Sequence, residues 1–242
     1  MAGRSKRLKA LTLAVAGVLG GALLVAGLAF TIREERQAAR DRQYINNMKE
    51  VAIALLWFGE NQGRLPPAVH RDKAGRPLCS WRLLLVPFLE GIMHAIEYDE
   101  PWDAPVNEWI STCRWFSFCW LPSEGGLNTN VVAITGPGTA FEEGRVVKLR
   151  EIAPDTILAI EIAKSGVRWA EPGDLDIEHI GQSITHGVEG RGVHVIFADG
   201  AVWFLRADVP LDELKKFFTI EGAKRYHREQ VLRPYAIWLP GH

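Results

Sequence analysis

The sequence has little of what would indicate a nucleic-acid partner, a disulfide framework or a zinc site. Its 28 basic and 29 acidic residues leave a net charge of −1, so no positive excess favours nucleic acid. Only three cysteines occur in 242 residues, and no second cysteine pair completes a zinc ribbon. Two interpretations stay open: Cys113 and Cys119 form a disulfide, or all three cysteines, Cys79 included, are free and mostly buried.

Motifs for catalysis are also missing. The segment GPGT at residues 136–139 lacks the lysine of a phosphate-binding loop, and GQSIT at residues 181–185 lacks the second glycine of a nucleophile elbow. No cysteine has a histidine at a recognised catalytic spacing. We therefore expect a protein that is not an enzyme.

A long uncharged run lies near the start of the chain. Residues 1–9 are strongly basic, and residues 10–32 carry no charge at all. A helix over 10–32 would be about 34 Å long, enough to cross a hydrocarbon core of ~30 Å. The sequence therefore predicts a single transmembrane helix at 10–32, with residues 1–9 in the cytoplasm and the remainder outside the cytoplasmic (inner) membrane. A cleaved signal peptide is the alternative, although its apolar region is usually shorter.

An amphipathic helix is predicted over residues 33–62, because Ile45, Met48, Ala52 and Leu55 recur at three- and four-residue spacing. No proline or glycine interrupts residues 33–58, so we expect this helix to continue the transmembrane helix without a break. Strand-like segments follow at residues 129–135, 156–163 and 193–205. Residues 63–242 are thus predicted to be an extracytoplasmic α+β domain, in which the long helix packs on an antiparallel sheet.

Tryptophans are dense in the first part of that domain, at Trp81, Trp102, Trp109, Trp115 and Trp120. Large rings that fill the core are the first interpretation, because aromatic side chains dominate core burial. The alternative is a stacking surface over residues 102–120. It would make the chain a membrane-anchored binding protein for a glycan or small solute.

The stretch THGVEGRGVHVIFADGAVWFL, residues 185–205, combines histidines with carboxylates. Asp199 and Gly200 predict a two-residue type I′ hairpin turn, in which Ala198 would face Ala201. His186, His194 and Asp199 are spread over both ends of the first strand, and His194 and Asp199 would lie about 16 Å apart, so they cannot share one metal ion. We therefore predict a hairpin here and neither a catalytic site nor a metal site.

A second acidic segment, AEPGDLDIEHI, contains alternating carboxylates at Glu171, Asp174, Asp176 and Glu178. Several oxygens at this spacing could bind calcium, although the EF-hand pattern is missing. A solvated acidic turn is the favoured interpretation, and a hydrolase that uses these carboxylates is the weakest one. No other cofactor is predicted.

Six blocks of sequence, in order along the chain, resemble the bacterial domain of unknown function 1559 family. They are QAARDRQYINNMKEVAIALLWFGENQGRLPPA, DKAGRPLCSWRLLLVPFLE, DEPWDAPVN, TNVVAITGPGTAF, TILAIEIAKSGVRWAEPGDLD and FADGAVWFL. Two departures stand out. The prepilin peptidase site that often precedes the apolar run in this family is absent, and the loop between His186 and Asp199 is about three residues longer.

The resemblance implies a pseudopilin-like, membrane-anchored protein with a structural or assembly role. It also makes His186, Asp199 and Gly200 a family box. The implied partners are the lipid bilayer through residues 10–32 and, through the N-terminal helix, further copies or proteins of a pseudopilus or secretion system. Nucleic acid is not an expected partner.

Overall fold

The computed structural model describes residues 2–89, 96–120 and 126–237, and for residues 2–18, 20 and 111 it describes the backbone alone. The chain divides into two compact units, Met1–Gln43 and Tyr44–His242. We describe each unit by itself.

Helix α1 runs from Ala2 to Gln62, so the predicted continuous N-terminal helix is confirmed. In its first unit the large side chains at Leu23, Leu24 and Leu28 are exposed. Among the residues that the structure describes, no helix is both long and apolar enough to cross a membrane. The basic tail 1–9 and much of the run 10–32 lie outside the described side chains, so the transmembrane span stays a prediction.

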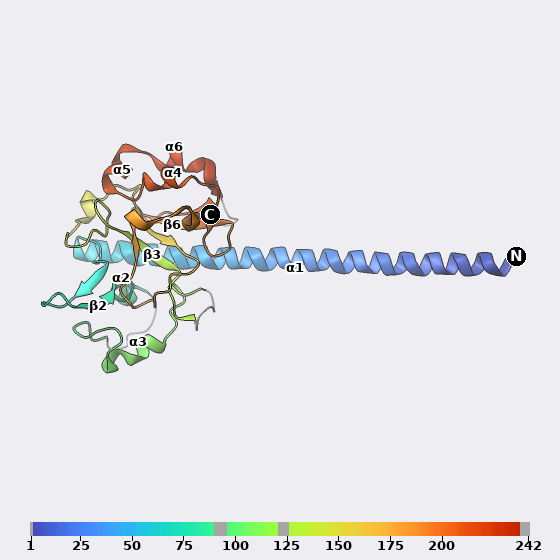
Figure 1. The fold of residues 1–242 in the computed structure, drawn as a ribbon, viewed down its shortest axis with the longest axis horizontal. Coiled ribbons are helices and arrows are strands. Elements are labelled where there is room, and N and C mark those ends of the chain that lie inside the picture. Colours follow the sequence, from blue (N-terminus) through green and yellow to red (C-terminus); the bar gives the residue numbers. More distant parts are fainter. Residues whose placement is uncertain (1, 90–95, 121–125, 238–242) are drawn as a thin grey trace. The chain divides into compact units, whose positions relative to one another are not determined.

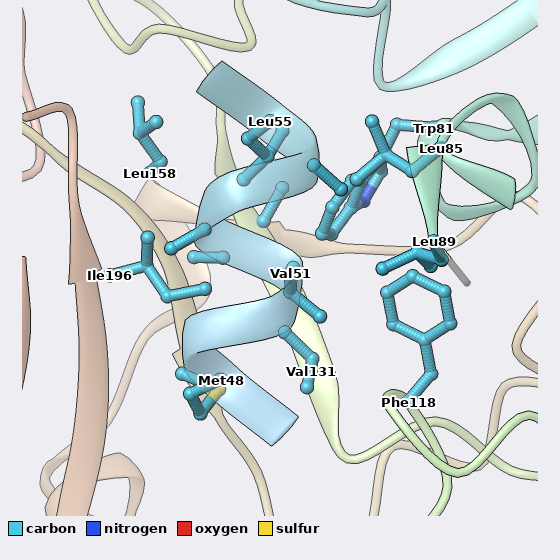
Figure 2. Close-up of a cluster of buried hydrophobic side chains, with 14 of the residues drawn as sticks. Met48, Val51, Leu55, Trp81, Leu85, Leu89, Phe118, Val131, Leu158 and Ile196 are labelled. Carbon is cyan, nitrogen blue, oxygen red and sulfur yellow. The ribbon is translucent and has the colours of Figure 1, made fainter. Parts of the chain in front are cut away.

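The second half of α1 forms the centre of the Tyr44–His242 unit. Its buried side chains recur at helical spacing and include Tyr44, Ile45, Met48, Val51, Ala52 and Leu55. Figure 2 shows this part of the helix between Leu158 and Ile196 on one side and Trp81 and Leu85 on the other. The helix ends at Gln62, where Gly63 takes a φ of 68° that favours glycine and two prolines follow soon after.

A six-stranded sheet supports the helix, in the order β5-β3-β4-β6-β7-β8. The strands are β3 (Val131–Thr135), β4 (Ile157–Glu161), β5 (Leu175–Asp176), β6 (Gly192–Phe197), β7 (Val202–Arg206) and β8 (Ala236–Ile237). All neighbouring pairs are antiparallel except β3 and β5, which are parallel. The predicted antiparallel sheet is therefore wrong at this edge, because β5 reaches β3 through a long loop and not through a hairpin.

Both faces of the sheet are buried. Met48 and Leu55 of α1 share one core with Val131 and Ile196, which point to the helix side. Val195 lies in a second core, on the opposite face. That face is covered by the short C-terminal helices α4 (Leu211–Lys215), α5 (Ile220–Arg225) and α6 (Arg228–Val231), which lie together in Figure 1. Burial on both faces explains why the central strands are apolar almost throughout.

The segment between α1 and β3 adds a third group of short elements around the helix. They are β1 (Val69–Arg71) paired with β2 (Pro77–Ser80), α2 (Trp81–Leu84), η1 (Val86–Phe88), η2 (Pro105–Asn107) and α3 (Glu108–Thr112). The remaining 3-10 turns are η4 (Leu149–Glu151), η5 (Ile177–His179), η6 (Gln182–His186) and η7 (Arg233–Tyr235). These loops bring residues far apart in sequence into the polar clusters described next.

Candidate functional site

The predicted hairpin exists, but its turn differs from the expected one. The Gly200 N–H donates to the Phe197 carbonyl, and the Phe197 N–H donates to the Ala201 carbonyl. The loop is therefore three residues long, with Gly200 at a φ of 85°, which is the glycine bulge that follows a type I turn. Ile196 consequently faces Val202, so the predicted register was wrong by one residue.

Asp199 has a second role beyond the turn. Its side chain accepts a hydrogen bond from the Ala201 N–H, and both of its oxygens accept from the Arg228 guanidinium at the start of α6. Partial burial tends to raise the pKa of Asp199, but the hydrogen bonds from Arg228 and Ala201 outweigh it and hold the pKa below its usual range. Asp199 thus holds the C-terminal helices against the hairpin.

The two histidines of the stretch have separate environments. His186 ends η6 on the surface and has no side-chain hydrogen bond or ion pair with the described residues. The side chain of His194 is 3% exposed, and its Nδ1 lies 2.5 Å from Oε2 of Glu161, whose side chain is 2% exposed. The structure therefore separates the members of the family box, because Asp199 pairs with Arg228 whereas His186 lies on the surface at the end of η6.

Glu161 joins strand β4 to the glycine loop ahead of β6. One carboxylate oxygen accepts from the Val188 N–H, and the other accepts from the N–H of His194. A Cβ on Gly187, whose φ is 56°, would meet the same carboxylate at 2.9 Å. Because a carboxylate and an imidazole this deeply buried have no direct path to a substrate, the pair fits a structural clamp better than a catalytic one.

A buried ion pair occupies the centre of the acidic segment. Arg82 of α2 is fully buried, and its guanidinium lies 2.7 Å from Oδ1 of Asp174. Four further hydrogen bonds run from Arg82 to carbonyl oxygens, those of Val131, Trp169, Glu171 and Gly173. All five donors of this side chain are thus directed at acceptors, which fixes the 169–174 loop against β3.

The carboxylates of the acidic segment, for which calcium binding was the alternative interpretation, lie in separate environments. Oδ1 of Asp174 also accepts from the Trp81 indole N–H and the Ala133 N–H, so that oxygen is already saturated. Asp176 instead caps η5, and Glu178 is exposed. In the described part of the chain, no three His, Cys, Asp or Glu side chains converge in a way that could hold a metal ion. Arg82 therefore takes the place that a cation would need beside Asp174.

The tryptophans mostly fill the core. Trp81, Trp115 and Trp120 are buried, and the indole N–H groups of Trp81 and Trp120 have hydrogen-bond acceptors. Trp102 and Trp109 are partly buried and pack against the same core. In residues 102–120, where a stacking surface was the alternative interpretation, Trp115 and Trp120 are buried while Phe116 is exposed.

All three cysteines carry free thiols. Burial raises the pKa of Cys79 to about 12, and burial likewise raises the pKa of Cys119 to about 12. A thiol with such a pKa is almost entirely protonated at neutral pH, so neither side chain is a nucleophile there.

An apolar hollow of about 570 Å³ lies beside α1, between Glu50, Ile53 and Trp57 of the helix and the segments 88–89 and 113–117. Ile53 and Trp57, one helical turn apart, are 48% and 53% exposed, and Phe116 opposite them is 61% exposed. Glu50 accepts a hydrogen bond from the Ser117 hydroxyl at one edge. Exposed aromatic and branched side chains gathered in this way are typical of protein contact surfaces. The helical spacing of Ile53 and Trp57 is visible in the sequence, but their exposure is not.

The comparison with known families gives one match. The family described as SBP_bac_10, protein of unknown function (DUF1559), matches residues 33–133. The match confirms the resemblance inferred from the sequence blocks, and it ends before the C-terminal box. No curated protein and no solved structure matches the chain.

Proposed function

We propose that the chain, whose residues 33–133 match the DUF1559 family of proteins of unknown function, is a single-pass, membrane-anchored, non-enzymatic subunit of a pseudopilin-like assembly. The observation that carries the proposal is that α1 takes part in both units of the chain. One part of this helix holds the uncharged run 10–32, and another part is built into the core of the α+β unit.

Anchoring follows from the sequence of the first part. Leu23, Leu24 and Leu28 are large apolar side chains that stay exposed within the described residues. A row of such side chains on an uncharged helix is costly in water and favourable in hydrocarbon. The basic residues before the run support an orientation in which the α+β unit lies outside the cytoplasmic membrane.

Assembly follows from the second part. The hollow formed with Ile53, Trp57 and Phe116 gives α1 an apolar face that the fold itself does not cover. A subunit that associates through its helix would bury this face against a neighbour. The buried ion pairs and the covered aromatic core also support a structural role, because they rigidify the unit.

Anchoring is tested by charge substitutions in the run. The change Leu23→Arg with Leu24→Arg adds about 2.5–3.5 kcal/mol per residue to insertion at the helix centre, so we expect the chain to leave the membrane fraction. The change Ala38→Arg with Ala39→Arg is the matched control, because it lies in the charged segment after the run. A wild-type chain that an alkaline wash removes from membranes would contradict the anchor.

Assembly is tested by photo-crosslinking in the native membrane. A photoreactive residue at Trp57 should trap a second copy or a distinct partner protein, whereas the same residue at exposed Val106 should not. Recovery of monomer alone from Trp57 would contradict helix-mediated assembly and leave the anchor standing.

A further inference from the structure

A second cavity, of about 520 Å³, lies in the Tyr44–His242 unit and shares none of its described lining residues with the apolar hollow beside α1. Three segments form most of its lining: residues 64–71 after α1, residues 140–147 after β3, and residues 172–174 before β5. Its volume is within the range of small-molecule sites, which is ~300–1,000 Å³. The sequence has no motif for it, because its walls come from three distant parts of the chain.

The negative charges of the cavity are already neutralised. Three carboxylates line it, and each one has an arginine partner. The pairs are Asp174 with Arg82, Glu143 with Arg71, and Glu142 with Arg145. Of the described residues that line the cavity, no carboxylate is therefore left to pair with a further cation.

Arg64 is such a further cation. It lines the cavity, is partly buried, and has no side-chain hydrogen bond or ion pair with the described residues. His70 lines the cavity in the same state, and its ring can donate a hydrogen bond whether or not it is charged. Because Arg64 is not fully buried, a molecule that enters from solvent can reach it. The cavity thus has a surplus of one positive charge, which an anion would balance.

The backbone around Arg64 is held by contacts with the segment after β3. The Gly63 carbonyl accepts a hydrogen bond of 3.1 Å from the Leu149 N–H, and Arg64 itself forms a β-bridge with Lys148. A guanidinium on a fixed backbone loses less conformational entropy on binding than one on a mobile loop. The position of Arg64 is therefore set before a ligand arrives.

The apolar part of the lining decides which kind of anion fits. Pro67, Val69 and Val146 line the cavity, and all three have surface open to solvent. A ligand with a small hydrocarbon part would bury that part against them. The planar guanidinium of Arg64 matches a carboxylate, which can accept two parallel hydrogen bonds from it. The two features together favour a small carboxylate over an inorganic anion.

We propose that this cavity binds a small monocarboxylate with an apolar body, whose carboxylate accepts hydrogen bonds from Arg64 and whose hydrocarbon part lies against Pro67, Val69 and Val146. The proposal does not depend on membrane anchoring or assembly. A chain that is neither anchored nor assembled would still bind the ligand, and an anchored and assembled chain could fail to bind it.

The test measures binding of benzoate, phenylacetate and isovalerate to the full-length chain in detergent, by saturation-transfer NMR and titration calorimetry. We expect at least one of them to bind saturably with a Kd below about 1 mM. The neutral amide of that probe should bind at least tenfold more weakly, because it has no charge to balance Arg64. Inorganic phosphate should also bind more weakly, because it has no hydrocarbon part.

Two variants place the ligand in this cavity. Arg64→Gln removes the surplus charge and should raise the Kd at least tenfold. Its matched control is Arg150→Gln, at an exposed arginine that does not line the cavity. Val146→Glu adds a carboxylate at a lining residue that is 65% exposed, and it should raise the Kd about threefold by charge repulsion. Val106→Glu is its control, since Val106 is 51% exposed and does not line the cavity.

Each result supports or overturns the proposal. If Arg64→Gln does not fold by circular dichroism, Val146→Glu decides, because it changes an exposed side chain. Absence of saturable binding for all three carboxylates overturns the proposal, and it is the result expected if Arg64 only interacts with the carbonyl groups at the end of α1. An amide or phosphate that binds as tightly as the carboxylate also overturns it, as does binding that Arg64→Gln leaves unchanged.

Discussion

Arg82 is a charged side chain without contact to solvent, and the five acceptors around it make this possible. Taking a guanidinium and a carboxylate out of water is costly, so such a pair adds little net stability compared with an apolar replacement of both. Removing one partner is different, because the other charge is then left buried and uncompensated. Arg82 therefore fixes where the 169–174 loop lies more than it adds stability.

The variant Arg82→Met tests this account. It should lower the free energy of unfolding by about 3–5 kcal/mol, because Asp174 loses its counter-ion inside the protein. Arg145→Met removes an exposed ion pair with Glu142 and should cost less than about 1 kcal/mol. Urea denaturation of both variants measures the difference. Equal losses in the free energy of unfolding would mean that the buried Arg82–Asp174 pair matters no more for stability than the exposed Arg145–Glu142 pair.

The lowered pKa of Asp199 determines in which direction the free energy of unfolding changes at acid pH. Its pKa in the folded chain is below the unfolded value of about 3.9, so folding is favoured by ionisation of this side chain. The Asp199–Arg228 pair therefore contributes fully above that pH, and its contribution is lost as the pH falls through the folded pKa.

We expect Asp199→Asn to be less stable than the wild type at neutral pH and to approach it at the acid end of the profile. Urea midpoints between about pH 2 and pH 6 measure this, because stability follows the protons bound by each state. Asp103→Asn, at an exposed side chain, is the control and should run parallel to the wild type. If the urea midpoint of Asp199→Asn differs from that of the wild type by the same amount at every pH, the titration of Asp199 is not the cause of the difference.

Pairs between distant residues explain what the sequence could not predict at this scale. Glu161 is the one carboxylate in an apolar strand, and His194 is the one polar side chain in another, which is a signal that each needs a buried partner. The sequence does not say which polar groups meet, since 33 positions separate these two and 92 separate Arg82 from Asp174. By contrast, the buried tryptophans were predictable from residue type alone.

At the scale of elements, the hairpin between β6 and β7 shows how far local rules reach. Alternating apolar residues around Asp-Gly predicted the positions of both strands and of the turn between them. The number of loop residues was not predictable, because Asp-Gly occurs both in two-residue turns and at the bulge of three-residue loops. In the structure Gly200 is left-handed at the end of a three-residue loop, and this moves every cross-strand partner by one position from the predicted register.

Gly200→Ala tests the left-handed position in that turn. A Cβ there is strained by about 1–2 kcal/mol, and it would also meet Cδ1 of Leu56 in α1 at 2.6 Å. Gly190→Ala is the matched control, because Gly190 has a φ of 72° and open space around it. Thermal unfolding should show a loss for both and a larger one for Gly200→Ala. Equal losses would mean that the turn does not press on α1.

At the scale of the whole molecule, α1 takes part in both compact units, which meet in the chain between Gln43 and Tyr44. The periodicity of Ile45, Met48 and Leu55 predicted that this part of the helix would be half buried. It is buried more completely, because the sheet covers one side of it and α2 with its neighbours covers the other. The three- and four-residue spacing of apolar residues predicts one buried face of the helix, and it does not predict that a second layer packs on another face.

This arrangement predicts where the chain can be shortened. A chain that begins at Tyr44 should fold and unfold cooperatively, because its compact unit is intact. A chain that begins at Gly63 should not fold. It loses Ile45, Met48, Val51 and Leu55, each worth about 1.5–3 kcal/mol when fully buried, and the sum is comparable with the ~5–15 kcal/mol of a whole domain.

Circular dichroism and urea denaturation of the two shortened chains measure this, with two point variants as controls in the chain that begins at Tyr44. Met48→Asp places a charge in the core and should abolish folding, as the longer deletion does. Ile53→Asp changes a side chain that is 48% exposed on the same helix, and it should leave the fold intact. If the chain that begins at Gly63 keeps a cooperative transition, the α+β unit has a core of its own and α1 is only attached to it. The helix would then be free to act as an anchor and assembly element alone.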